Sequence, residues 1–219
     1  MTYQHRDLEH KPLDLPVGKI VCVGRNYLEH IRELHNVAPE TPILFMKPAT
    51  ALVGLEQPIR LPKGRGQCHH EVELAVLVGQ ELRDADVATA QRAVAGYGVA
   101  LDLTLRDLQD ELKKNGYPWE IAKAFDGSCP LSPFLPPDAL PDPQATELAL
   151  RVNGELRQRG NTRQMMVGIF ELMAYISTHF TLRPGDVVLT GAPAGVGPLR
   201  SGDVLTLSLA SHDFAALVD

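Results

Sequence analysis

The sequence predicts a single α+β domain that is rich in strands and has few long helices. Short apolar segments, most of them rich in valine, recur along the chain and are bounded by glycine or proline, as β-strands are. Only a few segments show the longer apolar periodicity of a helix, and no repeat or linker is visible. The chain has 219 residues, of which 44% are hydrophobic, enough for one sizeable core.

The first half of the chain alternates strand, helix and loop patterns. Residues 1–18 are predicted to form a short leader segment, kept irregular by Pro12 and Pro16, and residues 19–219 the single main domain. The apolar runs and the Pro and Gly content then predict, in order, a strand at 19–23, a helix at 27–35, a strand at 43–45, a loop at 56–67, a strand at 70–78 and a helix at 86–96.

The second half has the clearest turn signals. Asn153-Gly154 is typical of a hairpin, and Asn161 can cap a helix that runs to Phe180. Arg183-Pro-Gly-Asp186 and Arg200-Ser-Gly-Asp203 each predict a turn that leads into a strand. The other predicted elements are a strand at 99–103, a helix ending at Gly116, an irregular segment at 130–143 that contains six prolines, and a strand at 148–152.

Two carboxylates open the apolar strand at 70–78 and a third interrupts the next strand. Glu71 and Glu73 are two residues apart, so in a strand they share a face, and Asp102 lies between apolar residues. Like charges beside a buried strand need compensation, which a divalent cation provides, and oxygen ligands favour Mg²⁺, Mn²⁺ or Ca²⁺ over zinc. The alternative is that the glutamates are solvated on an edge strand and Asp102 caps the following helix.

Other residues point to proton transfer and anion binding. His30 and Glu33 are three apart, so on a helix they share a face and can form a general base. Arg106 and Gln109 share a helical face just after Asp102, and Lys123 has apolar neighbours. The side chains of Arg106, Gln109 and Lys123 could contact an anionic substrate or simply face solvent.

Several classes of protein are disfavoured. The net charge is −6 without a block of like charge, which argues against nucleic-acid or membrane partners. The N-terminus lacks an apolar signal segment, and the three cysteines fit neither a disulfide framework nor a zinc site, so a reducing cytoplasmic setting is expected. The loop TGAPAGVGP at 190–198 lacks the Gly-Lys-Ser/Thr ending of a phosphate loop, and no G-x-S-x-G is present.

Taken together, six ordered motifs resemble the fumarylacetoacetate hydrolase family, in its compact branch of acylpyruvate hydrolases and oxaloacetate decarboxylase/tautomerases. The resemblance covers nearly the whole chain from about Lys19. It is carried by VGRNYLEHIREL (23–34), LFMKP (44–48), HHEVELAVLVG (69–79), GYGVALDLTLRDLQ (96–109), KAFDGSCPL (123–131) and GDVVLTGAPAGVGPL (185–199). It implies a roll of mixed β-sheets with peripheral helices, and a homodimer.

The resemblance also implies roles for residues of this chain. Glu71, Glu73 and Asp102 would hold Mg²⁺ or Mn²⁺, with Ca²⁺ as a further option. The implied catalytic residues are His30, Glu33 and Lys123, and the implied substrate contacts are Arg25, Lys47, Arg106, Gln109 and Thr190. The family phrase TGTPxGVG is altered here, because Ala192 replaces its second threonine, which implies the loss of a hydroxyl contact to substrate.

The expected activity is metal-dependent hydrolysis of acylpyruvate-type β-diketo acids, such as acetylpyruvate or fumarylpyruvate, through a stabilised enolate. The His30–Glu33 pair favours hydrolysis, because activation of water needs a base. The first alternative is an oxaloacetate keto–enol tautomerase or decarboxylase, and a further one is an isomerase of the 2-hydroxyhepta-2,4-diene-1,7-dioate type. Outside catalysis, the residues also allow a dicarboxylate-binding protein or a purely structural cation.

Overall fold

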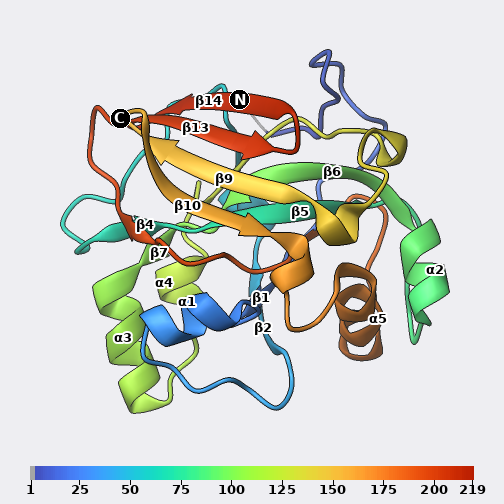
Figure 1. Cartoon of the computed structure of the whole chain (residues 1–219), viewed down its shortest axis with the longest axis horizontal. Helices are drawn as coiled ribbons and strands as arrows, with labels where there is room; N and C mark the ends of the chain where they lie inside the picture. Colours follow the sequence, from blue (N-terminus) through green and yellow to red (C-terminus); the bar gives the residue numbers. More distant parts are fainter. Residues whose placement is uncertain (1–2) are drawn as a thin grey trace.

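The computed structural model describes residues 3–219 and shows a strand-rich fold built from three sheets (Figure 1). The central sheet is mixed, because β1 pairs in parallel with β11 and β3 with β8, while its other neighbours are antiparallel. Its strands, in spatial order, are β2 (Ile43–Lys47), β1 (Ile20–Gly24), β11 (Val187–Leu189), β5 (Val72–Val78), β6 (Val94–Leu101), β8 (Cys129–Leu131) and β3 (Leu52–Gly54).

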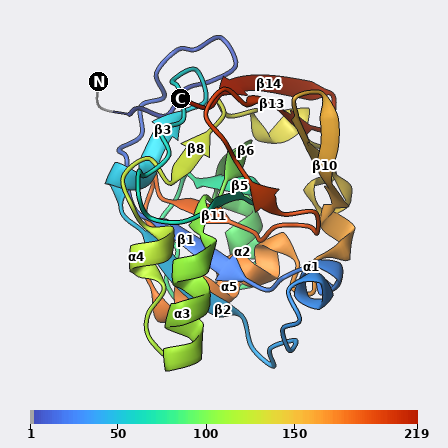
Figure 2. The same ribbon diagram turned by 90° about the vertical axis from the view of Figure 1, so that its left-hand side faces the viewer.

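Two smaller sheets complete the roll. The second sheet is antiparallel, in the order β10 (Glu155–Asn161), β9 (Glu147–Val152), β13 (Val204–Leu209) and β14 (His212–Leu217). The third consists of β12 (Gly197–Pro198), β4 (Cys68–His70) and β7 (Thr104–Leu105). In Figure 2 the second sheet lies to one side of β5 and β6, so the sheets curve around a shared interior.

Five α-helices lie at the periphery of the described chain. They are α1 (Leu28–Glu33), α2 (Val87–Arg92), α3 (Arg106–Asn115), α4 (Glu120–Lys123) and α5 (Ile169–His179), with short 3₁₀ turns at Ala49–Ala51, Pro137–Ala139, Pro143–Ala145 and Thr162–Gln164. Both views place the helices mostly in the lower half of the molecule (Figures 1 and 2). No helix among residues 3–219 has the length and apolar character needed to cross a membrane.

Strand β5 is buried along its whole length and separates two apolar clusters. Leu74 and Val76 pack in one cluster with the inner side chains of β9 and β13, whereas Ala75 and Leu77 pack in the other with Ile20 and Cys22. Since side chains alternate along a strand, Glu73 falls on the same face as Ala75 and Leu77. The position of this carboxylate therefore follows from the apolar pattern on either side of it.

Two predicted helices are shorter than expected. The helix predicted at 86–96 ends at Arg92, because Val94–Leu101 pairs with β5 and becomes β6. The strand predicted at 99–103 accordingly starts earlier and ends at Leu101.

The helix predicted from Asn161 to Phe180 begins only at Ile169, and Asn161 caps a 3₁₀ turn instead. The cause is tertiary: the Asn26 side chain bonds the N–H and the carbonyl of Val167, and its backbone carbonyl accepts from Met166. These contacts hold the segment in an extended conformation.

The predicted turns are confirmed. Asn153 and Gly154 both have left-handed φ values, 52° and 81°, as a two-residue hairpin between β9 and β10 requires. Asp186 accepts the N–H of Arg183, and Asp203 accepts the N–H of Arg200, so the two similar turns are closed in the same way. Helix α3 ends at Gly116, which adopts a φ of 68°.

The N-terminal segment is tied to the rest of the domain through His5. Its Nε2–H donates to the carbonyl of Gly185 at 2.9 Å, and the side chain is fully buried. Leu13, Leu15 and Val17 pack against the second apolar cluster. Residues of the predicted leader therefore contact the turn that leads into β11.

Burial of His5 makes stability depend on pH. Desolvation lowers the pKa of His5, so the folded chain keeps this imidazole neutral while the unfolded chain protonates it below about pH 6.5. Stability is therefore expected to fall as the pH drops below 6.5, and His5→Gln should flatten the curve of melting temperature against pH. His69 and His70, whose pKa values burial also lowers, leave a residual slope.

The matched control for this experiment is His179→Gln, since His179 is exposed on α5. An unchanged slope between pH 6.5 and 5 in His5→Gln would contradict the role given to His5.

Candidate metal centre and active site

The three predicted ligands meet at one end of the β5–β6 pair. Glu71 directly precedes β5, Glu73 is its second residue, and Asp102 directly follows β6. The ladder continues past the strand ends, because the N–H of Asp102 donates to the carbonyl of Glu71 at 2.8 Å. One oxygen of each carboxylate lies within 4.8 Å of the others, and all three residues are buried. The solvated edge-strand alternative is therefore wrong.

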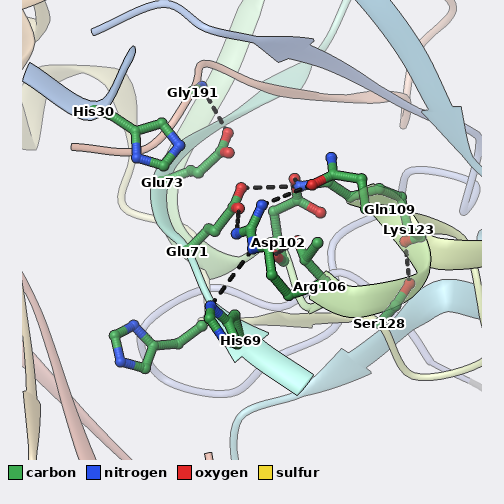
Figure 3. A network of polar contacts seen from close by, with 12 residues as sticks. His30, His69, Glu71, Glu73, Asp102, Arg106, Gln109, Lys123, Ser128 and Gly191 are labelled. Atoms are coloured by element: carbon green, nitrogen blue, oxygen red, sulfur yellow. Dashed lines mark hydrogen bonds and ion pairs between the residues drawn. The ribbon is translucent and has the colours of Figure 1, made fainter. Parts of the chain in front are cut away.

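Cationic side chains surround this cluster (Figure 3). Lys123 Nζ lies 2.8 Å from Glu71 Oε2 and 2.5 Å from Asp102 Oδ2, and Lys47 Nζ lies 2.8 Å from Asp102 Oδ1. Arg106 donates to Glu71 Oε1. Three cations thus contact two of the three carboxylates, while Glu73 receives no cationic contact in the described chain.

This asymmetry sets the protonation of the two glutamates apart. Burial raises the pKa of Glu71, but Lys123 and Arg106 outweigh it and hold that pKa well below its usual value. Burial, together with the charges of Asp102 and Glu71, raises the pKa of Glu73 well above its usual value. Burial alone would lower the pKa of Lys123, yet Asp102 and Glu71 raise it to about 12, so this amine stays charged. Glu73 is therefore the carboxylate that lacks a positive partner.

The predicted proton-transfer pair is also assembled. His30 Nδ1 lies 3.2 Å from Glu33 Oε2 on α1, and the imidazole is buried on the side of the cluster nearest Glu73 (Figure 3). Because Glu33 holds Nδ1, Nε2 is the ring nitrogen left to face the cavity. Both oxygens of Glu33 accept the N–H of Gly195, at 3.0 and 3.1 Å.

The glycine-rich loop at 190–198 therefore donates backbone hydrogen bonds to two acidic side chains, Glu33 and Glu73. Besides Gly195, the N–H of Gly191 donates to Glu73 Oε2 at 2.6 Å. Both glycines have left-handed φ values, 96° and 99°, and a Cβ on Gly195 would lie 1.9 Å from the carbonyl oxygen of Arg157. Only glycine fits at these positions, and the two backbone N–H groups link the loop to the metal cluster and to the His30–Glu33 pair.

The predicted substrate contacts divide into two groups. Arg25, Arg106 and Gln109 line the cavity above the carboxylates, with Arg106 Nη1 2.6 Å from Gln109 Oε1. Lys47 and Thr190 do not line it. Lys47 is fully buried behind Asp102, and the hydroxyl of Thr190 donates to the carbonyl of Leu74 at 2.9 Å. Neither side chain therefore reaches the cavity in this structure.

The cavity has further walls that the sequence did not single out. Phe45 and Trp119 pack with ring centroids 5.9 Å apart, and Lys123 Nζ lies 5.2 Å from the Phe45 centroid. Asn36 and Lys113 also line it, as does Ala192, the residue that replaces the second threonine of the family phrase. Lys113 could have been found from its helical spacing from Arg106 and Gln109. No local sequence pattern pointed to Trp119 or Asn36.

The donor set fits a hard divalent cation. It offers only oxygens, their atoms converge, and Glu73 is a buried carboxylate whose charge no side chain offsets. Zinc sites in proteins are richer in nitrogen and sulfur ligands, and the three cysteines are free and outside the cluster. Glu71, Glu73 and Asp102 are therefore the residues that would hold Mg²⁺ or Mn²⁺.

Residues 19–217 match the family model of the C-terminal domain of fumarylacetoacetate (FAA) hydrolase. The chain belongs to the fumarylacetoacetate hydrolase family. It is 56% identical over 217 residues to the oxaloacetate tautomerase YcgM of Escherichia coli K12, with 99% of each chain covered. It is 49% identical over 184 residues to the mitochondrial oxaloacetate tautomerase FAHD1 of Bos taurus, covering 84% of this chain and 83% of that one.

Solved structures of the family share the fold. A fumarylacetoacetate hydrolase family protein from Yersinia pestis CO92 superposes with a TM-score of 0.98 at 54% identity, covering 99% of this chain and 100% of that one. The fumarylpyruvate hydrolase of Pseudomonas aeruginosa, solved with Mn²⁺ and pyruvate, gives a TM-score of 0.91 at 35% identity, covering 99% and 95%. The predicted mixed-sheet roll is thereby confirmed.

Glu73→Gln is expected to weaken Mn²⁺ binding, because it removes one ligand charge. Substitution of residues that only hydrogen-bond a metal ligand typically lowers metal affinity by about 10–100-fold. Substitution of the ligand itself should lower it by at least as much. Because the pKa of Glu73 is raised, Mn²⁺ competes with a proton there, and wild-type affinity should fall as the pH falls. Calorimetry at two pH values measures both effects.

The control is Glu111→Gln, the same chemical change at an exposed position of α3. Equal Mn²⁺ affinity in Glu73→Gln and wild type would remove Glu73 from the ligand set.

Gly195→Ala tests the loop that holds Glu33. The added methyl group collides with the Arg157 carbonyl, so the N–H is expected to leave Glu33 and turnover to fall by tenfold or more, as roughly expected when a base loses its orientation. Mn²⁺ affinity should change little, because Gly195 does not contact the carboxylate cluster.

Gly202→Ala provides the matched control, since Gly202 also has a left-handed φ, 88°, but a Cβ there meets no atom within 4 Å. Equal losses of activity in both variants would show that backbone strain, and not the contact with Glu33, is responsible.

Proposed function

We propose that this chain is a metal-dependent oxaloacetate keto–enol tautomerase. The observation that carries the proposal is the 56% identity, over 99% of both chains, to a protein named oxaloacetate tautomerase. The sequence motifs favoured hydrolysis of acylpyruvates, with tautomerisation as the alternative. The relatives reverse that order, since the fumarylpyruvate hydrolase is only 35% identical.

The charges of the site suit a dianionic substrate. Lys47, Lys123 and Arg106 pair with Glu71 and Asp102, while Glu73 has no such partner among the described residues, and Arg25 and Lys113 also line the cavity. With a divalent cation bound, the cavity would carry positive charge that the two carboxylates of oxaloacetate would offset. When bound, Mg²⁺ or Mn²⁺ contributes Lewis-acid stabilisation of negative charge on the keto oxygen.

The residues of the chain supply the proton transfer. Ketonisation moves a proton from the enol oxygen to C3, without water, a leaving group or a change in oxidation state. His30 Nε2 takes up the proton that leaves the enol oxygen and delivers it to C3, or carries it in reverse, and Glu33 stabilises the imidazolium through Nδ1 in between. Lys123, held charged beside Glu71 and Asp102, stabilises the enolate oxygen, and Arg106 with Gln109 orients a substrate carboxylate.

A second candidate is cleavage of acylpyruvates. It is supported by the likeness to the fumarylpyruvate hydrolase solved with Mn²⁺ and pyruvate, and by the His30–Glu33 pair, which can equally deprotonate a water. Both reactions develop negative charge on the same type of enolate, so they place the same demands on Lys123 and the carboxylates. The homodimer implied by the resemblance stays a prediction alongside either activity.

The test is to assay metal-free protein with Mg²⁺ or Mn²⁺ added back, following ketonisation of enol-oxaloacetate and cleavage of acetylpyruvate by ultraviolet absorbance. Fast metal-dependent ketonisation with negligible cleavage is expected. Fast cleavage with slow ketonisation would replace the tautomerase with the hydrolase.

Glu33→Gln should lower ketonisation by about 10²-fold or more, the usual contribution of a positioned acid–base group, without altering Mn²⁺ affinity. Glu29→Gln makes the same change on the same helix, where Glu29 is exposed and pairs with Arg32, and should leave the rate unchanged. If both variants retain wild-type rates, the His30–Glu33 pair is not the proton carrier.

A further inference from the structure

One face of α3 presents three polar side chains to the cavity. Arg106, Gln109 and Lys113 are spaced by three and four residues, so they lie in one row along the helix, and all three line the cavity. Arg106 reaches the metal cluster through Glu71. Lys113 lies seven residues further on, about 10 Å along the axis, and helical side chains lean back towards the N-terminus. Lys113 therefore approaches the cavity from about two turns further along α3 than Arg106, which contacts Glu71.

Lys113 has few partners for a side chain that is largely buried. Its side chain is 20% exposed, and its one ion pair in the described chain is with Asp110 Oδ1 at 2.9 Å. Asp110 is itself 61% exposed, so water weakens this pair. An ammonium group has three donors, which leaves Lys113 with donors to offer inside the cavity.

Arg25 reaches the same cavity from the end of β1. It adopts a left-handed φ of 62°, which a non-glycine residue rarely does, and such strain is found most often at functional sites. Its Nη1 donates to the carbonyl of Val37 at 3.2 Å, one of five possible donors. Arg25 lies just before α1, and Lys113 lies on α3; both helices are in the lower part of both views (Figures 1 and 2).

Among the described residues that line the cavity, the acidic ones all belong to the carboxylate cluster. They are Glu71, Glu73 and Asp102. Arg25 and Lys113 thus face the cavity with no acidic lining residue left to pair with them. Two cations that line the same cavity as the candidate metal ligands form a second place for a carboxylate.

We propose that Lys113 and Arg25 form a distal carboxylate subsite, which makes the enzyme selective for dicarboxylic 2-oxo acids. The inference rests on the proposed function and adds the residues that would recognise the second carboxylate of the substrate. The 2-oxo acid end of the substrate lies at Glu71, Glu73 and Asp102, and the second carboxylate accepts from Lys113 and Arg25. Charge-assisted hydrogen bonds of this kind are the strong ones, and Arg25 can bind a carboxylate with two parallel N–H groups.

A matched pair of ligands isolates the second carboxylate. Oxaloacetate and 2-oxobutyrate share the 2-oxo acid end and the chain length, but 2-oxobutyrate has a methyl group in place of the distal carboxylate. Binding of each, freshly dissolved, to the Mg²⁺-loaded protein is measured by calorimetry, which does not depend on turnover. Wild type should bind oxaloacetate more tightly by about tenfold or more.

Lys113→Met keeps the length of the side chain and removes its charge. It should weaken oxaloacetate binding by about tenfold, and change 2-oxobutyrate binding less than about twofold. Arg25→Lys, which keeps a charge but loses the paired donors, should show the same pattern to a smaller degree. Lys114→Met is the control, because Lys114 is the exposed neighbour on α3 and does not line the cavity.

Each other outcome is decisive. Equal weakening of both ligands in Lys113→Met, or no weakening of either, would overturn the subsite, as would a wild type that fails to discriminate. A wild type that discriminates by binding but does not ketonise oxaloacetate would keep the subsite and overturn the tautomerase assignment.

Discussion

Glu71, Glu73 and Asp102 lie side by side in the interior, and the repulsion among their charges has to be offset within a few ångströms. Lys47, Lys123 and Arg106 provide the protein's share of that compensation, and each is buried beside the carboxylate it contacts. The three cations approach from β2, α4 and α3, so these elements are held around one end of β5 and β6. The carboxylate cluster thus helps to fix the positions of β2, α3 and α4 relative to β5 and β6.

The glycine-rich loop extends this arrangement to the proton-transfer pair. Gly191 donates to a carboxylate of the cluster and Gly195 to Glu33, through backbone N–H groups of the same short segment. The distance between the metal-binding and proton-transfer groups is therefore set by backbone, which varies less than side chains do. A site for enolate chemistry gains from such rigidity, since the proton must reach one carbon atom while charge is stabilised on the neighbouring oxygen.

The chemistry of such a site is shared by hydrolysis, decarboxylation and tautomerisation of 2-oxo acids, because all three pass through an enolate. The choice among them depends on whether water reaches the substrate and on which other groups the substrate meets in the cavity. Besides the carboxylates, Arg25, Lys113, Trp119 and Asn36 line this cavity.

The sequence by itself determined the strand-rich class, the shared face of Glu71 and Glu73, and the His30–Glu33 pair, because each depends on spacing within one segment. Strand alternation placed Glu71 and Glu73 on one face, and helical spacing paired His30 with Glu33. Tertiary structure alone decided that Asn26 holds 166–167 extended, so that α5 begins at Ile169, and that the side chains of Lys47 and Thr190 do not reach the cavity. Those features depend on contacts between residues more than 50 positions apart, which no local pattern records.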